Sequence, residues 1–305
     1  MKNKHLISIT DFTGKEILEV LNLARKIKKA PHQFQTRLQG QLFGLIFEKP
    51  STRTWISFET GIFQLGGGTI YLGPDDMKLG VREVVKDVAR VLDRYLAGVI
   101  LRTFSHETIT EFRKYFHRPV INGLSDFEHP CQALADYMTI LEKAGSVTKP
   151  TLAFVGDGNN VLNSLLLLAA TVGGKVRYAT PKGLEPAKHV LNEALKIAKR
   201  TGALIEGSHD PEAAVKNADF VYTDVWVSMG EEKIRHKKLK QFQGMQVNAA
   251  LMKKARKGAG IMHCLPAHRG EEITDDVLES KNSIVFDQAE NRLHVQKAVL
   301  LHLCQ

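Results

Sequence analysis

The feature of this sequence that most constrains its fold is a regular alternation between short apolar runs and amphipathic segments of helical length. The run at 41–47 has the length of a strand and lies between Gly40 and Pro50. The segment that follows it places four apolar residues on one helical face, namely Trp55, Phe58, Ile62 and Leu65. We therefore expect Trp55 to face the core. Strands that alternate with helices predict a parallel sheet covered on both faces.

The alternation starts again after a joint at 145–150, so the chain is expected to form two α/β halves. Its 305 residues are about twice the ~150 of a typical domain. The expected strands are 41–47, 69–72, 99–101, 120–122, 152–155, 175–179, 220–222, 260–262 and 283–286. Helices are expected at 11–30, at 130–143 and, as the last element, at 291–303. The predicted fold class is α/β, with two parallel-sheet domains and helices on both faces of each sheet.

Composition excludes several other classes of protein. Hydrophobic residues make up 43% and charged residues 25%, which excludes a disordered, collagen-like or disulfide-stapled chain. The longest apolar run falls well short of the ~18 residues that a membrane span needs. The first residues, MKNKHLISITDF, lack the apolar core of a signal peptide. We expect a soluble, cytoplasmic protein without a membrane partner.

A net charge of +9 would suit a protein that binds nucleic acid, an acidic membrane surface or anionic substrates. The basic runs at 235–238 and 253–257 contain no aromatic residues that could stack on bases, so they are interpreted as solvated helix surface and no nucleic-acid partner is expected. The three cysteines, Cys131, Cys264 and Cys304, are far apart and odd in number. They predict neither a disulfide framework nor a metal site, and they suit a reducing compartment.

Ligands of open α/β sheets bind beyond the carboxyl ends of the strands, so the loops after the strands are the places to search. The first of these loops is Ser51-Thr52-Arg53-Thr54, at the start of a helix. Three hydroxyls, a guanidinium and the free N–H groups of a helix N-terminus suit a phosphate. Helix capping would account for Ser51 alone. No Walker sequence precedes this helix.

A second loop contains His129-Pro130-Cys131-Gln132. Residues three apart lie one turn above each other on a helix, so His129 and Gln132 could face one ligand. Arg102 follows the strand that ends at Leu101 and could join them. The alternative is a structural histidine at a helix start.

The loop at 156–161, Gly-Asp-Gly-Asn-Asn-Val, resembles only half of a dinucleotide fingerprint. Val161 replaces the last glycine, and the next strand ends without an acidic residue for a ribose. NAD binding is therefore not expected. Two adjacent asparagines at a helix start still offer amide donors to a carboxylate.

A fourth loop, His263-Cys264-Leu265-Pro266, follows the strand at 260–262. A lone cysteine is often inert packing. A cysteine just after a strand, beside a histidine, is also placed to touch a substrate. The residues alone leave both possibilities open.

Four ordered motifs together resemble those of the aspartate/ornithine carbamoyltransferase family. Phe47-Glu48-Lys49-Pro50-Ser51-Thr52-Arg53-Thr54 and His129-Pro130-Cys131-Gln132 are similar to the family's carbamoyl-phosphate motifs. The segments at 224–230, Asp-Val-Trp-Val-Ser-Met-Gly, and at 263–266 resemble those of its ornithine-specific members. The similarity extends from the first helix to the last.

The resemblance implies a domain organisation, an assembly and a reaction. Residues 1–140, with a C-terminal helix at about 288–305 that returns to them, would bind carbamoyl phosphate, and residues 141–287 would bind ornithine. A homotrimer, or an assembly of trimers, would have active sites at its subunit interfaces. The carbamoyl group would pass to the δ-amine of L-ornithine, giving L-citrulline for arginine biosynthesis, with no cofactor and no metal.

The resemblance also implies a role for individual residues. Those implied to bind carbamoyl phosphate are Ser51, Thr52, Arg53, Thr54, Lys78, Arg102, His129, Gln132, Cys264, Leu265 and Arg292. Those implied to bind ornithine are Asn160, Asp224, Ser228 and Met229. Arg102, His129 and Cys264 would be catalytic.

Two positions depart from the family pattern. Trp55 stands where the family usually has arginine after Ser-Thr-Arg-Thr, and Lys78 stands where relatives often have glutamine or histidine. A lysine still suits phosphate, so we expect the function to persist. Rival acceptors within the family are aspartate, N-acetylornithine and putrescine. An NAD-dependent oxidoreductase and a nucleic-acid-binding module are the alternatives from other classes.

Overall fold

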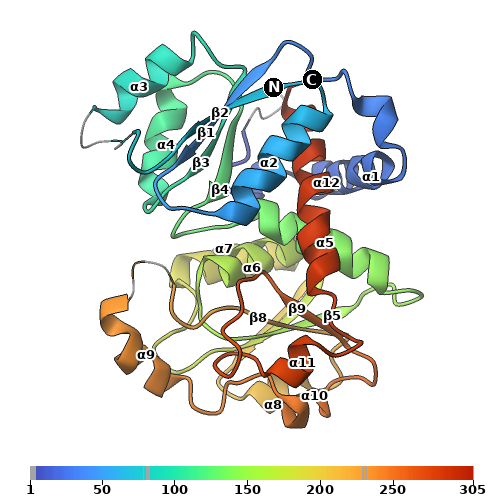
Figure 1. The fold of residues 1–305 in the computed structure, drawn as a ribbon. Coiled ribbons are helices and arrows are strands. Elements are labelled where there is room, and N and C mark those ends of the chain that lie inside the picture. Colours follow the sequence, from blue (N-terminus) through green and yellow to red (C-terminus); the bar gives the residue numbers. More distant parts are fainter. Residues whose placement is uncertain (1–4, 78, 80–82, 229, 231, 305) are drawn as a thin grey trace. The chain divides into compact units, whose positions relative to one another are not determined.

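The structure is a computed structural model, and it describes residues 5–77, 79, 83–228, 230 and 232–304. The chain forms two compact units. The first unit contains Met1–Ala135 and Asn291–Gln305, and the second contains Asp136–Glu290. Each unit has its own parallel β-sheet with helices on both faces (Figure 1). The chain also returns to the first unit at its C-terminal end. The two parallel sheets and this return confirm the predicted fold class.

The sheet of the first unit has four strands in the order β2-β1-β3-β4, all parallel. Its strands are β1 (Leu42–Phe47), β2 (Gly68–Leu72), β3 (Gly98–Arg102) and β4 (Val120–Leu124). In the register of this sheet, Leu45 of β1 lies opposite Tyr71 of β2 and Ile100 of β3. Strands β1 and β3 are almost wholly buried, as expected for parallel strands covered on both faces.

Helices α3 and α4 cover one face of this sheet, and α2 lies on the other (Figure 1). The helices of this unit are α1 (Gly14–Lys29), α2 (Thr52–Gln64), α3 (Val85–Leu92) and α4 (His106–Tyr115). Two helices contribute to both units, α5 (Pro130–Lys143) and α12 (Val285–Cys304). The predicted first helix is confirmed in α1, where Thr13 and Glu16 form a reciprocal capping box. Short 3₁₀ turns occupy Ile9–Asp11 and Pro31–Phe34.

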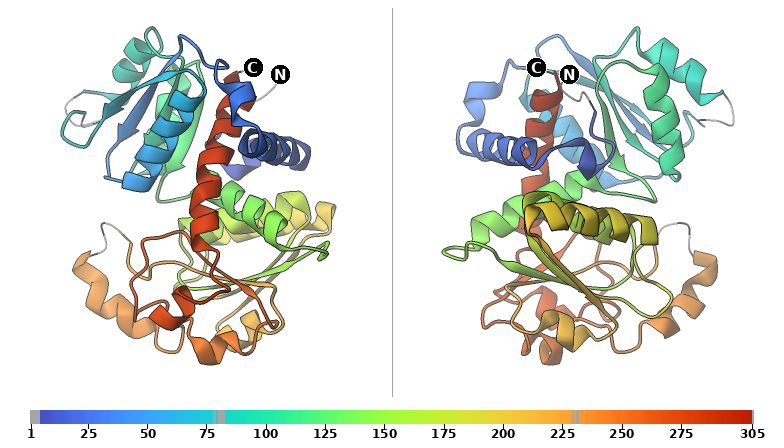
Figure 2. Two further views of the ribbon diagram at one scale, coloured as in Figure 1. Left: turned by 45° about the vertical axis from the view of Figure 1, so that its right-hand side comes forward. Right: turned by 180° about the vertical axis from the view of Figure 1, so that it is seen from behind.

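The sheet of the second unit has five parallel strands in the order β7-β6-β5-β8-β9. Its strands are β5 (Thr151–Val155), β6 (Lys175–Ala179), β7 (Leu204–Ser208), β8 (Phe220–Thr223) and β9 (Gly260–His263). Figures 1 and 2 show α6 and α7 side by side on one face of this sheet, with α8, α10 and α11 on the other. Its helices are α6 (Asn160–Val172), α7 (Lys188–Thr201), α8 (Pro211–Val215), α9 (Arg235–Gln241), α10 (Ala249–Met252) and α11 (Asp275–Leu278). A 3₁₀ turn at Glu232–Ile234 precedes α9.

Two details of the expected elements are wrong. The strand expected at 283–286 is only a single bridge from Ser283 to Ile261, and α12 already begins at Val285. Trp55 does not face the core: it is 38% exposed and stacks on the ring of Tyr71, with centroids 4.5 Å apart. Its indole N–H donates to Glu59 one turn further along α2. The sequence spacing of Trp55 matches that of the buried residues of α2, but a ring in the first turn of a helix can instead lie against a neighbouring strand.

Candidate functional site

Each sheet has one place where consecutive crossovers leave in opposite directions, and the predicted site residues follow the strands at these places. In the first unit, the chain passes from β1 to β2 on one side and from β3 to β4 on the other. Ser51–Thr54 follow β1, and Arg102 ends β3. In the second unit the corresponding strands are β5, followed by the loop at 156–160, and β8, followed by Asp224. Such switch points are where open α/β sheets bind ligands.

Ser51 caps helix α2, because its hydroxyl accepts a hydrogen bond from the amide of Thr54 at 3.4 Å. The next two residues, Thr52 and Arg53, are exposed at the positive end of the helix dipole. Thr54 is buried and turns its hydroxyl inward. The loop therefore presents the hydroxyl of Thr52, the guanidinium of Arg53 and the backbone N–H groups at the start of α2 to an anion.

Arg292 of α12 connects this loop to α5. Its Nη2 donates to Oγ1 of Thr54 at 3.0 Å, and its Nη1 donates to Oε1 of Gln132 at 2.9 Å. All three side chains are buried. Three predicted residues that are far apart in sequence are thus brought together within the first unit.

His129 lies among three guanidinium groups of the same unit. Burial lowers the pKa of its imidazole well below the usual value, and the positive charges of Arg292, Arg102 and Arg53 lower it further. The ring is therefore neutral at physiological pH. Arg102 is buried as well, so this part of the first unit combines positive charge with a neutral imidazole.

In the second unit, the carboxylate of Asp224 is held by two donors. The thiol of Cys264 donates to its Oδ1 at 2.9 Å, and the amide of Asn159 donates to its Oδ2 at 2.9 Å. Burial raises the pKa of Cys264 well above that of a free thiol, and the negative charge of Asp224 raises it further. Cys264 is accordingly a thiol rather than a thiolate.

The start of α6 adds helix N–H groups to this half of the site. Asn159 is the capping residue, and its Oδ1 accepts from the amides of Val161 and Leu162. Asn160, predicted to hold the ornithine carboxylate, is the half-buried first residue of the helix. Gly158 has a packing role: a Cβ there would collide with the backbone of Leu184 and Glu185. This close approach of the backbone explains why the position is a glycine, so no bound dinucleotide is needed to explain it.

The loop after β9 is fixed by a buried histidine. Nδ1 of His263 accepts from the amide of Leu265 at 2.8 Å, and Nε2 lies 3.2 Å from Oε1 of Glu272. Leu265 has a φ of 58°, in the left-handed region that few non-glycine residues adopt, and its peptide bond to Pro266 is cis. Cys264 and Leu265 belong to the second unit, beside Asp224.

A cluster of His263, Cys264 and Asp224 has metal-ligand residue types within 4.8 Å, but its chemistry does not fit a cation. Both ring nitrogens of His263 are engaged, one as acceptor from Leu265 and one toward Glu272. The thiol of Cys264 is protonated and donates to Asp224. The cluster is a hydrogen-bonded network.

Several residues around Asp224 were not predicted from sequence. Gln288 accepts from the amide of His263 at 3.0 Å and donates to the buried Asp136 at 2.7 Å. Tyr222 is buried close to Cys264, and burial together with the negative charge of Asp136 raises the pKa of its hydroxyl. A polar pair, Asp136 and Gln288, separated by more than 150 residues leaves no local signal.

Lys238 corrects the interpretation of the basic run at 235–238 as solvated surface. It is 4% exposed, and its ammonium forms an ion pair with Asp157 at 2.6 Å. Arg235 of the same run pairs with Glu271. The second run is exposed as predicted at Lys253, Lys254, Arg256 and Lys257.

Two predicted residues, Lys78 and Met229, lie outside the residues that the structure describes. Ser228 is half-buried in the loop after Asp224. The stack of Trp226 on Phe242, with centroids 4.9 Å apart, fixes the start of that loop against the apolar core.

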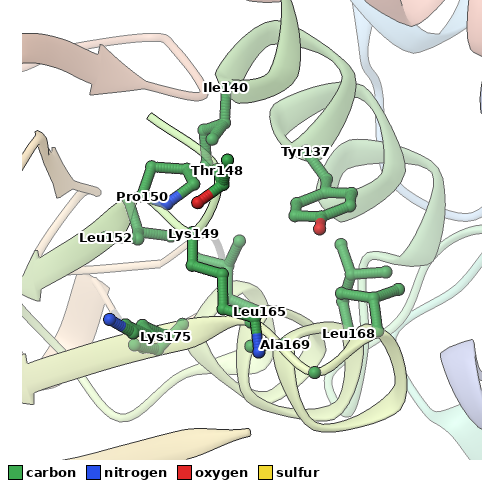
Figure 3. A pocket seen from close by; sticks show the side chains of 14 residues that line it. Tyr137, Ile140, Thr148, Lys149, Pro150, Leu152, Leu165, Leu168, Ala169 and Lys175 are labelled. Atoms are coloured by element: carbon green, nitrogen blue, oxygen red, sulfur yellow. The ribbon is translucent and has the colours of Figure 1, made fainter. Parts of the chain in front are cut away.

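A separate cavity of about 120 Å³ lies in the second unit, between α5, the C-terminal half of α6 and the first residues of β6 (Figure 3). The Tyr137 hydroxyl points toward Leu168, and Lys175 points away from the cavity. The cavity lies at the amino ends of the strands and contains none of the predicted residues. Among the residues described, no helix is long and apolar enough to cross a bilayer.

Two parallel α/β units, each with its polar residues at the switch point of its sheet, define a class of two-domain α/β enzymes. Two family models that match the chain narrow this class to one family. Residues 4–142 match the carbamoyl-P binding domain of aspartate/ornithine carbamoyltransferase, and residues 148–303 match the Asp/Orn binding domain. The chain therefore belongs to the aspartate/ornithine carbamoyltransferase family.

Similar proteins include several ornithine carbamoyltransferases. The chain is 49% identical to the Thermococcus kodakarensis ornithine carbamoyltransferase, over 98% of this chain and 96% of that protein. The Pyrococcus furiosus ornithine carbamoyltransferase structure has a TM-score of 0.94 at 48% identity, covering 98% and 96% of the two chains. The anabolic ornithine carbamoyltransferase of Campylobacter jejuni has a TM-score of 0.95 at 41% identity, covering 99% of each.

Proposed function

We propose that the protein transfers the carbamoyl group of carbamoyl phosphate to the δ-amine of L-ornithine and releases L-citrulline and phosphate. The observation that carries the choice of acceptor is Asp224, a buried carboxylate held by Cys264 and Asn159. An anionic group fixed in this way suits the α-ammonium of a free amino acid. The relatives that carry the name ornithine carbamoyltransferase support the same acceptor.

The first unit would bind carbamoyl phosphate. Ser51, Thr52, Arg53 and Lys78 would hold the phosphate, with the amides at the start of α2 as further donors. Thr54, Gln132 and Arg292 form one hydrogen-bonded group that would orient the carbamoyl end. This division assigns residues 1–140 and about 288–305 to carbamoyl phosphate and 141–287 to ornithine.

Arg102 and His129 would stabilise the carbonyl oxygen as it becomes tetrahedral. Because His129 is neutral, its ring can donate one hydrogen bond without repelling the neighbouring guanidinium groups. Donors placed at a developing oxyanion are among the largest contributions to catalysis. Carbamoyl phosphate carries its own leaving group, so we propose a reaction without metal or redox cofactor.

The δ-amine must lose its proton before it can attack. A lysine-like amine has a pKa of ~10.4, so deprotonation at pH 7 costs about 4–5 kcal/mol. The C–N bond then forms, the C–O bond to phosphate breaks, and the departing phosphate takes the remaining proton. Positive charge on the first unit would favour the neutral amine.

Cys264 would align the amine rather than accept its proton. A thiol with a raised pKa that already donates to Asp224 keeps its own proton, and its sulfur lone pairs can accept a weak hydrogen bond from the δ-amine. Leu265 would complete the carbamoyl pocket with its backbone carbonyl. Asn160 would bind the α-carboxylate, with Ser228 and Met229 closing around the ornithine.

Citrulline formation from carbamoyl phosphate tests the proposal, with ornithine, N-acetylornithine, putrescine and aspartate compared as acceptors. We expect a strong preference for ornithine. Acetylornithine has no α-ammonium to pair with Asp224, and putrescine has no α-carboxylate for Asn160. Turnover with another acceptor would keep the role of the first unit and overturn that of Asp224.

We also propose a homotrimer, or an assembly of trimers, in a reducing cytoplasm, acting in arginine biosynthesis. The three cysteines are all free, which suits such a compartment. The word anabolic in the names of the Pyrococcus furiosus and Campylobacter jejuni relatives supports the biosynthetic direction. Light scattering of the purified protein tests the assembly.

A further inference from the structure

Three ligand atoms converge in the second unit a few residues beyond the loop that carries Cys264. Nδ1 of His268 lies 3.9 Å from Oε2 of Glu271 and 3.9 Å from Oε2 of Glu272. One ligand atom from each residue lies within 4.8 Å of a ligand atom from each of the other two. Nδ1 of His268 and the Oε2 atoms of both glutamates are shielded from solvent, and none of these three atoms has a hydrogen-bond partner among the residues described.

The other oxygen of each carboxylate is already held. Oε1 of Glu271 accepts from Arg235, and Oε1 of Glu272 accepts from the amide of His268 and lies 3.2 Å from Nε2 of His263. One oxygen of each group is therefore fixed by the protein while the second points into the cluster. Ligating carboxylates in metalloproteins show this arrangement, since hydrogen bonds to one oxygen orient the other toward the ion.

Burial makes the free oxygen of Glu272 the most informative of the three atoms. The residue is 0% exposed, and a buried carboxylate oxygen without a partner is destabilising unless a cation or a proton compensates it. The side chains of His268 and Glu271 are 41% and 27% exposed, so an ion could enter from solvent past them. Water could then occupy the remaining coordination positions.

We propose that His268, Glu271 and Glu272 bind a divalent first-row transition cation such as Zn²⁺, Co²⁺ or Mn²⁺. One imidazole nitrogen and two carboxylate oxygens are a donor set that these ions accept, whereas Ca²⁺ and Mg²⁺ prefer oxygen ligands alone. Ligand atoms around tetrahedral zinc lie about 3.4 Å apart, so the observed separations close with side-chain shifts of less than about 1 Å.

The cation would stabilise the loop of the site and take no part in the reaction. Glu272 anchors His263, which in turn holds the amide of Leu265. An ion bound to Glu272 and His268 would therefore fix both ends of the segment at 263–272. Saturation with the ion is expected to raise the thermal unfolding temperature, because the ion binds the folded state.

Titration of the EDTA-treated full-length protein with ZnCl₂, CoCl₂ and MnCl₂ tests the site. Calorimetry reports stoichiometry and affinity, the visible spectrum of Co²⁺ reports nitrogen and oxygen ligation, and Mn²⁺ paramagnetic resonance gives an independent measure of binding. We expect one equivalent to bind. Loss of one protein ligand should weaken binding at least roughly tenfold, as even changes in groups that only orient the ligands do.

Four variants distinguish this site from others. His268→Gln and Glu271→Gln should lose binding, and circular dichroism will verify their folding. His209→Gln removes an imidazole that lies near Glu185 elsewhere in the same unit and should bind normally. Cys264→Ser should also bind normally. Retention of binding in His268→Gln, loss of binding in Cys264→Ser, or no binding by the unmodified protein would each overturn the proposal.

Discussion

The thiol of Cys264 donates a hydrogen bond to Oδ1 of Asp224 across 2.9 Å, so the proton between the two groups resides on the sulfur. Burial and the adjacent carboxylate both raise the pKa of the thiol. Asn159 holds the second oxygen of Asp224 and keeps the carboxylate in this orientation. The cysteine of the site is therefore a hydrogen-bond donor at neutral pH, in contrast to the thiolate of a nucleophilic cysteine.

This contact predicts the reactivity of the thiol. Replacement Asp224→Asn removes the negative charge that raises the pKa of Cys264, so alkylation by iodoacetamide at pH 8 should become several-fold faster. Peptide mass spectrometry measures the rate at each cysteine. Cys131 is an internal control, because burial raises the pKa of its thiol to about 12 and it should stay unmodified in both proteins. Equal rates at Cys264 in the two proteins would contradict the assigned protonation state.

The exposed guanidinium of Arg53 is predicted to be essential for use of carbamoyl phosphate. Arg53→Ala should lower kcat/KM for carbamoyl phosphate by about 10²–10³-fold, the usual effect of removing one strong electrostatic contact from a reacting group. The variant should fold normally, because the side chain is exposed. Arg113→Ala, an exposed arginine of the same unit on α4, is the matched control and should keep full activity. Near-normal turnover in Arg53→Ala would exclude the phosphate role.

The loops that carry the site were predictable because each has an unusual composition directly after an apolar strand. Ser51–Thr54 follow β1, as expected, and the segment at 263–266 begins at His263, the last residue of β9. Strand β7 was not predicted, because it is an edge strand with mostly exposed side chains and contains a glutamate and a glycine, Glu206 and Gly207. Neither alternation nor an apolar run therefore marks it.

Long-range polar contacts are the part of the site that periodicity could not predict. Lys238 was expected on the surface because it belongs to a basic run, and its partner Asp157 is 81 residues away. The pairing of Gln288 with Asp136 spans 152 residues. Charge patterns identify which side chains are ionised, but only the packing of α9 and α12 decides which of them are buried. The role of Arg292 was similarly available only through the family resemblance.

The neutral state of His129 predicts a pH dependence of stability. An imidazole whose folded-state pKa lies below its unfolded value of ~6.5 binds more protons in the unfolded state, so stability falls as pH falls below ~6.5. His129→Gln should remove this contribution and flatten the slope by up to about 1.4 kcal/mol per pH unit between pH 6 and 5. Urea unfolding at several pH values measures the slope. The exposed His32→Gln is the control, and an unchanged slope in His129→Gln would disprove a depressed pKa.

The ion pair of Lys238 and Asp157 predicts a strongly non-additive pair of substitutions. Lys238→Met leaves the carboxylate of Asp157 buried without its partner and should destabilise the protein by about 3–5 kcal/mol. Asp157→Asn in the same background removes that charge and should restore a large part of the loss. A double-mutant cycle from urea unfolding gives the coupling energy, which we expect to exceed about 1 kcal/mol. Because the pair fixes the loop before α6, Lys238→Met should also raise KM for ornithine more than KM for carbamoyl phosphate. Additive effects, or equal changes in both KM values, would show that this pair does not position the ornithine loop.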